Sequence, residues 1–300
     1  MWTFDDFDAW GDAVSGASLR MGCDGIERHE WTLGRVDLGP VVLQVASEGG
    51  GNVCYGGNTH AGTMLFLPLT HAHEHFVNGE PLDDESLFAI PRGADFCIRL
   101  HKRAHSWCSI ALPGDADQWA VSASGSGRMA GNAGTVPRLR RLATDVAAAL
   151  LPQAPGSPAH EAAARDLLAA AADCLPGRAE PAPALGRRRL DRGDIIRRAM
   201  AVIDSMPMMP SAAILAANVG VTSRTLLRAF HEAFGRSPKQ YLMLRELHVV
   251  RRSLMQRESS DATVADILVR HGIWEFGRFA ARYRRQFGEL PSHTVRRVRG

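Results

Sequence analysis

Residues 211–238 read SAAILAANVGVTSRTLLRAFHEAFGRSP, and residues 263–291 read TVADILVRHGIWEFGRFAARYRRQFGELP. The two stretches share one pattern. In each, a short apolar segment meets a glycine (Gly220 and Gly272), and a second, amphipathic segment follows. Each stretch then ends on a glycine with a proline three residues later. A glycine allows the sharp bend that joins two helices, so each stretch predicts two short helices around a tight turn.

The second segment of each copy carries large apolar residues four positions apart: Leu226, Phe230 and Phe234 in the first copy, and Phe279, Tyr283 and Phe287 in the second. Side chains at this spacing lie on one face of a helix and can be buried together. Helix, tight turn and second helix form the helix-turn-helix unit, whose second helix enters the major groove of DNA. The sequence therefore predicts two such units in tandem.

On these residues, roughly the last third of the chain resembles the DNA-binding domain of the AraC/XylS transcriptional regulators. The Gly272-Ile273 turn, the aromatic stripe of the second copy and the Gly-x-x-Pro endings carry the resemblance. Two positions depart from the family pattern, because Ala281 and Leu290 stand where arginine and serine are usual. The resemblance implies promoter DNA and RNA polymerase as partners, a homodimer, and activation more often than repression. It also implies a cupin-like N-terminal domain that senses a small-molecule effector.

Charge is distributed unevenly along the chain. Residues 181–300 hold 22 Lys and Arg against 10 Asp and Glu, although the net charge of the whole chain is only +3. A basic C-terminal region beside an acidic remainder is typical of a nucleic-acid-binding module joined to a domain with another role.

Several classes of protein are disfavoured. The five cysteines show no CxxC spacing, which argues against a disulfide framework or a structural zinc site. No apolar run of 18 residues or signal peptide occurs, and neither a Walker loop nor a GxSxG or HExxH motif is found. We expect a soluble, cytoplasmic protein without membrane contact, cofactor or enzymatic activity.

The predicted fold class is α+β with two domains. A cupin-like β-barrel or sandwich with two C-terminal helices covers 1–175, a linker covers 176–190, and an all-α tandem helix-turn-helix domain covers 191–300. Short alternating apolar runs between Glu27 and Leu112 indicate the strands. The remaining local predictions are a helix within 1–20, a glycine-rich loop at the pocket mouth over 49–58, a hairpin at Asn78-Gly79, a loop over 113–136, and helices over 137–151 and 158–174.

The helices over 137–151 and 158–174 can either close the β-domain or pair with another subunit. In the C-terminal domain, an amphipathic helix is predicted over 191–206. A second helix, starting at Ser237-Pro238, would bridge the two helix-turn-helix units over about 30 Å. On this bridging helix Arg251 and Arg252 either contact phosphate or form a solvated face.

Candidate DNA contacts follow from the first turns of the two recognition helices. Thr222 is the predicted N-cap of the first, and Arg224 and Arg228 are the predicted base readers because arginine donates two hydrogen bonds to guanine. Arg278 is the corresponding reader in the second, with Phe276 or Ala281 available to a thymine methyl group. The predicted DNA-binding residues are Ser223, Arg224, Thr225, Arg228, Glu275, Phe276, Arg278, Arg282, Arg284 and Arg285. Arg284 and Arg285, with Arg296, Arg297 and Arg299, are expected to contact the backbone.

The stretch His71-Ala72-His73-Glu74-His75 has three interpretations. On a strand the three imidazoles would share one face and could hold a metal, they could line a ligand pocket or respond to pH, or they could be a surface cluster. A cupin metal site would need a further histidine where this chain has Phe96, so no metal is predicted and His71, His73 and His75 remain the only candidates. The alternative function is a metal-dependent cupin enzyme with an appended DNA-binding module.

Overall fold

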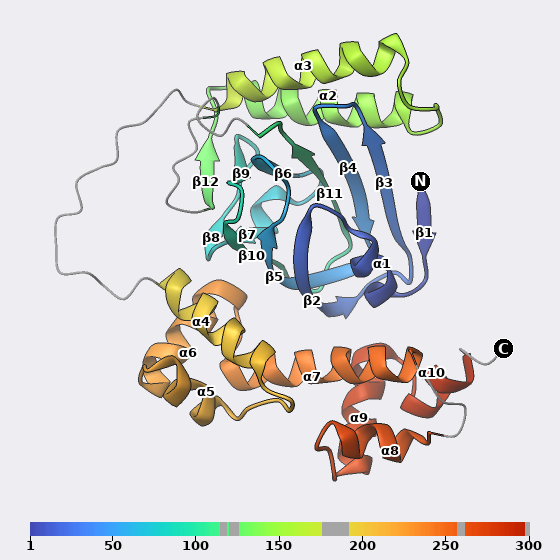
Figure 1. Cartoon of the computed structure of the whole chain (residues 1–300), viewed down its shortest axis with the longest axis vertical. Coiled ribbons are helices and arrows are strands. Elements are labelled where there is room, and N and C mark those ends of the chain that lie inside the picture. The colour runs from blue at the N-terminus through green and yellow to red at the C-terminus, as the bar shows by residue number, and fades with distance from the viewer. Residues whose placement is uncertain (115–118, 120–125, 176–191, 257–261, 298–300) are drawn as a thin grey trace. The chain divides into compact units, whose positions relative to one another are not determined.

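The computed structural model describes residues 1–114, 119, 126–175, 192–256 and 262–297. These residues belong to two compact units, 1–187 and 188–300. Strands dominate the first unit and helices the second (Figure 1). This arrangement confirms the predicted two-domain α+β fold class. The predicted linker over 176–190 lies outside the described residues.

In the described part of the first unit, the strands form two antiparallel sheets that stay separate and do not close into a barrel. The larger sheet has seven strands in the order β1-β3-β4-β11-β6-β9-β12, and the smaller has five in the order β2-β5-β10-β7-β8. The strands are β1 (Trp2–Phe4), β2 (Ala17–Ile26), β3 (Trp31–Asp37), β4 (Val42–Glu48), β5 (Gly50–Asn58), β6 (Met64–Pro68), β7 (Phe76–Val77), β8 (Glu80–Pro81), β9 (Ser86–Ile90), β10 (Asp95–Leu100), β11 (His105–Ala111) and β12 (Gly127–Ala130).

Strands β4, β11 and β6 are neighbours at the centre of the larger sheet. Side chains alternate between the two faces of a strand, so β4 sends Leu43 and Val45 into one hydrophobic core and Gln44 and Glu48 toward the opposite face. In the same way, Trp107 of β11 joins a second core that includes residues of the smaller sheet. The larger sheet therefore separates two cores, one under the helices and one between the sheets.

Helices α2 (Thr135–Leu150) and α3 (Pro158–Cys174) cover the outer face of the larger sheet (Figure 1) and correspond to the helices predicted at 137–151 and 158–174. Their buried side chains share the first core with that sheet. The close approach explains Gly34 of β3, where an added Cβ would lie 2.9 Å from the Leu151 side chain. The helices thus close the β-domain, and their pairing with a second subunit stays a prediction.

Two local predictions near the N-terminal half are confirmed. Helix α1 (Phe7–Ala13) lies within 1–20, and its N-cap Asp6 accepts a hydrogen bond of 3.0 Å from the Ala9 backbone N–H. Asn78 and Gly79, with φ of 50° and 89°, join β7 to β8, as a tight hairpin requires. The loop predicted over 113–136 contains β12, and 115–118 and 120–125 lie outside the described residues.

The loop predicted for GGGNVCYGGN over 49–58 is wrong, because this segment forms β5, a buried inner strand of the smaller sheet. Its glycines reflect the close approach of neighbouring backbone rather than flexibility. A Cβ on Gly50 would lie 1.9 Å from the Gly25 carbonyl oxygen, and one on Gly51 would lie 2.3 Å from the Lys102 nitrogen. Glycine content alone therefore misled the prediction.

The described part of the second unit is helical. A buried aromatic cluster in its second half includes Phe279, Tyr283 and Phe287. The predicted helix over 191–206 is present as α4, and the predicted bridging helix as α7. The helices are α4 (Arg192–Ser205), α5 (Ala212–Val219), α6 (Ser223–Phe234), α7 (Pro238–Met255), α8 (Val264–Arg270), α9 (Phe276–Phe287) and α10 (Pro291–Arg297).

Replacing Gly51 by alanine tests the reason for the glycines in β5. We expect Gly51→Ala to lower the free energy of unfolding of the first unit by about 2–3 kcal/mol, because the added methyl group would press on backbone atoms that cannot move aside. Tryptophan fluorescence during urea unfolding measures this, since five of the six tryptophans lie in the first unit. The control is Gly127→Ala, where a Cβ meets open space. Equal midpoints for both variants would contradict the explanation.

Candidate DNA-binding interface and ligand pocket

The first helix-turn-helix unit consists of α5 and α6. Ser211 caps α5, and Gly220 ends it with a left-handed φ of 74°. Thr222 then caps α6 by accepting a hydrogen bond of 3.1 Å from the Thr225 backbone N–H, which confirms the predicted N-cap. The apolar stripe Leu226, Phe230 and Phe234 is buried, and Phe234 stacks on Tyr241 of α7 with ring centroids 4.4 Å apart.

Burying this stripe leaves the opposite face of α6 exposed. Ser223 and Arg224 are exposed, and no ion-pair partner of Arg224 is found among the residues that the structure describes. Arg228 is 69% exposed and lies 3.5 Å from the Glu232 carboxylate. The half-buried Thr225 directs its hydroxyl to that of Thr222, 2.8 Å away. The Arg224 guanidinium is thus available to DNA without first breaking an ion pair. Arg228 would have to leave Glu232 to contact a base or a phosphate.

The second helix-turn-helix unit repeats the design with α8 and α9. A capping box between Thr263 and Asp266 starts α8. Gly272, with φ of 73°, makes the turn. The stripe Phe279, Tyr283 and Phe287 is buried. Each copy thus pairs a short helix, α5 or α8, with a recognition helix, α6 or α9.

The residues predicted on α9 divide into two groups. Phe276, Arg278, Arg284 and Arg285 are exposed, and Arg278 forms an ion pair of 2.7 Å with the exposed Glu275. Arg282 is only half-exposed, lies 3.6 Å from Glu246 of α7, and has its guanidinium over the Phe279 ring at 5.8 Å. The structure therefore places Arg282 against α7, away from the exposed candidates on α9.

One exposed aromatic side chain, Trp274, was not singled out from the sequence. It is 72% exposed, directly precedes the N-cap of α9, and is followed by Phe276, which is 40% exposed. Large exposed aromatic groups at the entrance of a recognition helix are suited to apolar contact with thymine methyl groups. Trp274 could have been found from its position in the sequence. It lies between the turn glycine Gly272 and the start of α9, and it does not belong to the buried stripe of residues spaced four apart.

Of the two roles predicted for Arg251, phosphate contact or a solvated face, the structure supports neither. Its side chain is 8% exposed and lies 3.0 Å from the Glu289 carboxylate, and its guanidinium lies 4.5 Å from the centre of the Phe287 ring. It also donates to the Tyr283 hydroxyl at 3.5 Å. Arg251 therefore ties α7 to the end of α9, while the neighbouring Arg252 is exposed as predicted.

Helix α7 carries both recognition helices. Its 18 residues give a length of about 27 Å. A capping box between Ser237 and Gln240 starts it, with Pro238 in the first turn. Residues of α7 contact α6 through Tyr241 and α9 through Arg251. The two helix-turn-helix units are thus both packed against the single continuous helix α7.

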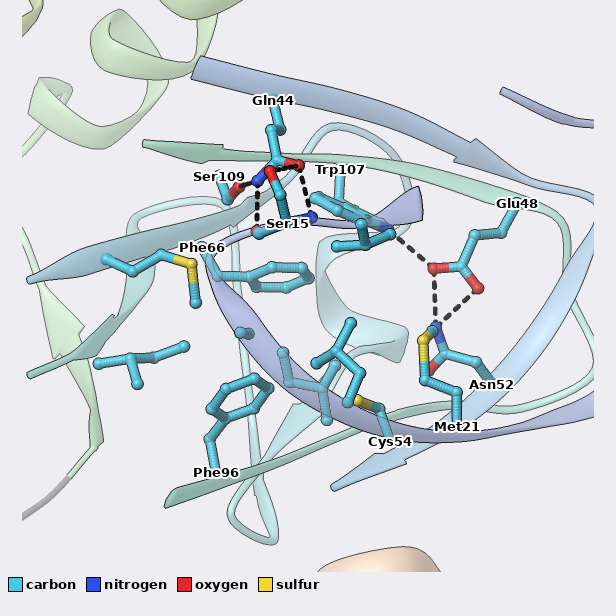
Figure 2. A pocket seen from close by; sticks show the side chains of 16 residues that line it. Ser15, Met21, Gln44, Glu48, Asn52, Cys54, Phe66, Phe96, Trp107 and Ser109 are labelled. Carbon is cyan, nitrogen blue, oxygen red and sulfur yellow. Dashed lines mark hydrogen bonds between the residues drawn. The ribbon is translucent and has the colours of Figure 1, made fainter. Parts of the chain in front are cut away.

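A pocket lies between the two sheets of the first unit (Figure 2). It holds about 50 Å³, measured as the space open to the centre of a water-sized sphere. The lining is mainly apolar, with two polar groups of side chains: one around Gln44, and one around Glu48 and Asn52 (Figure 2). The lining residues are Val14, Ser15, Ala17, Leu19, Met21, Gln44, Glu48, Asn52, Cys54, Met64, Phe66, Ile90, Phe96, Ile98, Trp107 and Ser109.

Glu48 is fully buried at one side of this pocket. Its Oε1 accepts hydrogen bonds of 2.7 Å from both Asn52 Nδ2 and Trp107 Nε1, and Nε2 of His105 lies 3.3 Å away. Its Oε2 accepts a second bond of 2.7 Å from Asn52. Burial lowers the pKa of His105, but the adjacent Glu48 carboxylate outweighs this and raises it overall. The Glu48 side chain is therefore surrounded by several hydrogen-bond donors.

The metal-binding interpretation of His71, His73 and His75 required a strand, and the structure has a helical turn there instead. His71 has a left-handed φ of 53°, and the 3₁₀-helix η1 (Ala72–Glu74) follows it. His73 is exposed, while His75 is buried and its Nδ1 donates to the His71 carbonyl oxygen at 3.0 Å. A helical turn points the three rings in different directions. Within the described ranges, no cluster of three His, Cys, Asp or Glu side chains is suited to a metal.

Two recognition helices on a shared scaffold helix define the second unit as a tandem helix-turn-helix domain, and the comparisons agree. Residues 215–297 match a family model described as a helix-turn-helix domain. The chain is 32% identical to the probable thc operon regulatory protein of Rhodococcus erythropolis over 120 residues, 40% of this chain and 34% of that protein. It is 36% identical to XylDLEGF operon transcriptional activator 1 of Pseudomonas putida over 77 residues, 26% and 23% of the two chains.

A crystal structure of a probable AraC family transcriptional regulator from Rhodopseudomonas palustris CGA009 is also similar. It is 30% identical with a TM-score of 0.33, covering 36% of this chain and 99% of its own. The C-terminal domain of this protein is a helix-turn-helix domain of the AraC type. The chain spans between about a quarter and a third of the length of the two curated relatives named above. Among the described residues, no helix combines the length and apolar character needed to cross a membrane.

The buried Arg251 predicts a large effect on folding of the second unit. We expect Arg251→Ala to cost about 2–3 kcal/mol, because it leaves the Glu289 carboxylate, which is 22% exposed, without its closest cation. Far-ultraviolet circular dichroism during thermal unfolding measures this. The matched control is Arg252→Ala on the exposed face, for which we expect less than about 1 kcal/mol. Equal losses for both variants would show that Arg251 does not anchor α9.

The buried His75 predicts a dependence of stability on pH. Burial, followed by the nearby His105, lowers its pKa to about 3 in the folded chain. Because the unfolded value is about 6.5, the unfolded chain binds more protons as the pH falls below that value, and stability drops by about 1.4 kcal/mol per pH unit.

The variant His75→Gln tests this dependence because glutamine does not titrate. Urea midpoints of the unaltered chain should fall between pH 6.5 and 5, and those of the variant should fall less. Identical pH dependences in the two proteins would assign the effect to other groups.

Proposed function

We propose that this protein is a sequence-specific DNA-binding transcriptional regulator, controlled by a small molecule bound in its N-terminal domain. The observation that carries the proposal is the pair of recognition helices on α7, each with exposed arginine in its first turns. An arginine placed there can donate two hydrogen bonds to a guanine edge. The AraC-type domain supports the same conclusion.

Sequence recognition is assigned first to α6. Arg224 is the principal base reader in this proposal, with Arg228 beside it one turn later and Ser223 and Thr225 at the start of the helix. On α9 the reader is Arg278, and Phe276 and Trp274 offer apolar contact to thymine. Because α9 has fewer polar readers, it contributes less to specificity than α6.

Backbone contacts supply affinity in this proposal. Exposed arginines can neutralise phosphates without reading sequence, and α9 and α10 carry several beyond the base readers: Arg284, Arg285, Arg296 and Arg297. The excess of basic over acidic residues in 181–300 acts in the same direction. Arg282 is assigned to positioning α9 on α7 through Glu246, so its contribution to binding is indirect.

The pocket between the sheets supports an effector role for the first unit. A mainly apolar cavity with a few polar groups is the usual form of a small-molecule site. An effector that binds one arrangement of the regulator more tightly shifts its population and thereby promoter occupancy. The proposal further includes a homodimer, contact with RNA polymerase and activation of transcription, which rest on the family resemblance. It also includes action in the cytoplasm, which rests on the sequence.

The alternative function, a metal-dependent cupin enzyme with an appended DNA-binding module, depended on His71, His73 and His75 sharing one face. Since η1 separates these rings, that premise is not met. Bound metal after purification without a histidine tag, lost when His71 and His73 are replaced, would restore the alternative.

A selected oligonucleotide pool at fixed salt tests the regulator directly. We expect the unaltered chain to enrich one site and Arg224→Ala to lose about 1–3 kcal/mol of binding free energy on it, with relaxed preference at one base position. Fluorescence anisotropy on the enriched site and its single-base variants gives both quantities.

The matched comparison is Arg285→Ala, which removes a backbone contact. It should weaken binding to all sequences alike and reduce the slope of log affinity against log salt by about 1. If neither the unaltered chain nor Arg224→Ala distinguishes the enriched site from competitor DNA, the domain binds DNA by charge alone and the proposal is wrong.

A further inference from the structure

We propose that the pocket between the sheets takes a compact, apolar molecule with a hydrogen-bond-donating head group, an amine or an alcohol, seated on Asn52 and Glu48. This inference rests on the proposed function in one respect, namely that the pocket is the effector site. It goes further by assigning the polarity of the ligand and the residues that recognise it.

Asn52 carries an unsatisfied hydrogen-bond acceptor at the pocket wall. This side chain is 4% exposed, and both oxygens of Glu48 lie 2.7 Å from its amide nitrogen. The carboxylate can only accept, so the nitrogen must face Glu48 and the orientation of the amide is fixed. Its Oδ1 is left buried without a hydrogen-bond partner, and a buried unpaired acceptor destabilises the fold. A donor on a ligand would remove that cost.

The charge of the lining residues also restricts the ligand. None of the sixteen lining residues is lysine, arginine or histidine, and the one ionisable carboxyl among them, Glu48, is fully buried. The imidazole of His105 lies 3.3 Å from the Glu48 carboxylate and is already engaged by it. An anionic head group would therefore be desolvated beside a carboxylate without a counter-ion. The lining favours neutral or cationic donors and opposes anions.

Only one of the two polar groups in the lining has an unsatisfied hydrogen-bonding atom. The polar group around Gln44 is internally satisfied, since Gln44 Oε1 accepts from the backbone and hydroxyl of Ser15 and Nε2 donates to the Ser15 carbonyl and to Ser109. This leaves the Asn52 and Glu48 side as the place for the ligand donor (Figure 2). Phe66, Phe96 and Ile98 offer apolar contact to the rest of the molecule.

The cavity also limits size and chemistry. Because about 50 Å³ is open to the centre of a water-sized sphere, the enclosed space is larger than that figure and admits one small ring. Burial raises the pKa of the Cys54 thiol well above its usual value, so this cysteine stays protonated and does not attack a ligand. Binding is therefore non-covalent.

Four probes with the same ring test the assignment: benzylamine, benzyl alcohol, benzoate and toluene. Calorimetric titration into the full chain should give at least tenfold tighter binding for benzylamine or benzyl alcohol than for benzoate and toluene. The ratio between the two donors then shows whether the site prefers a cation or a neutral group. Benzoate binding as tightly as the better donor, or no difference between the donors and toluene, would overturn the proposal.

A variant locates the head group. Asn52→Leu keeps the side-chain size but removes the acceptor, so it should weaken the better donor tenfold or more and leave toluene unchanged. Met21→Leu, which alters the apolar lining alone, should change both probes equally. An equal loss for the donor and for toluene in Asn52→Leu would contradict recognition by Asn52. The four-probe comparison on the unaltered chain decides the ligand class even if Asn52→Leu does not fold.

The same ligand then separates this inference from the proposed function. Binding of the better donor is measured without DNA, and occupancy of the enriched DNA site is measured with and without that donor. Tight, selective binding with unchanged DNA occupancy would support the ligand class and contradict effector control. Altered occupancy of the DNA site, without tighter binding of donors than of benzoate, would support effector control and contradict the ligand class.

Discussion

The N-terminal domain depends on one buried carboxylate. Glu48 ends β4 in the larger sheet, and Asn52 lies in β5 of the smaller sheet, so their hydrogen bonds join the two sheets close to where the chain passes from one to the other. Burying a charge costs several kcal/mol unless partners compensate it, and Trp107 and His105 of β11 supply the remaining contacts. The hydrogen bonds that satisfy Glu48 also fix Asn52 at the pocket wall. The junction between β4 and β5 and the proposed ligand site therefore share the same residues.

The C-terminal domain could be predicted closely because its determinants are local. The apolar stripes with residues four apart, the capping residue Thr222 and the turn glycines each act within one or two helical turns. All three features are found as predicted. The N-terminal domain depends on distant partners, and there the sequence was less informative. Glycine-rich β5 was predicted as a loop because the carbonyl of Gly25 and the backbone of Lys102, which demand glycine, are remote in sequence.

Arginines show why individual site residues were harder to predict than helices. Arg224, Arg251 and Arg282 all follow helical patterns with basic character, yet only Arg224 is exposed on a recognition helix. Arg251 is drawn inside by Glu289 and Phe287, and Arg282 is drawn onto α7 by Glu246. Whether an arginine contacts DNA or its own scaffold depends on an acidic partner in another element, which helix periodicity does not reveal. The choice among the three interpretations of the histidines at 71–75 also depended on backbone conformation, since the left-handed residue at His71 begins a helical turn and not a strand.

Because α7 is one continuous helix, any change in its length both shifts and rotates the second recognition helix relative to the first. Each residue of an α-helix advances the chain by about 1.5 Å and turns it by about 100°. A single residue inserted in α7 would therefore move the second recognition helix little along the axis of α7 but turn it toward a different side of the duplex. Substitutions on the surface of α7 leave this phase intact, whereas changes in its length alter it. The spacing of the two recognition helices can thus change in evolution only by steps that restore the helical phase, while the proposed base readers on α6 and α9 can change one at a time.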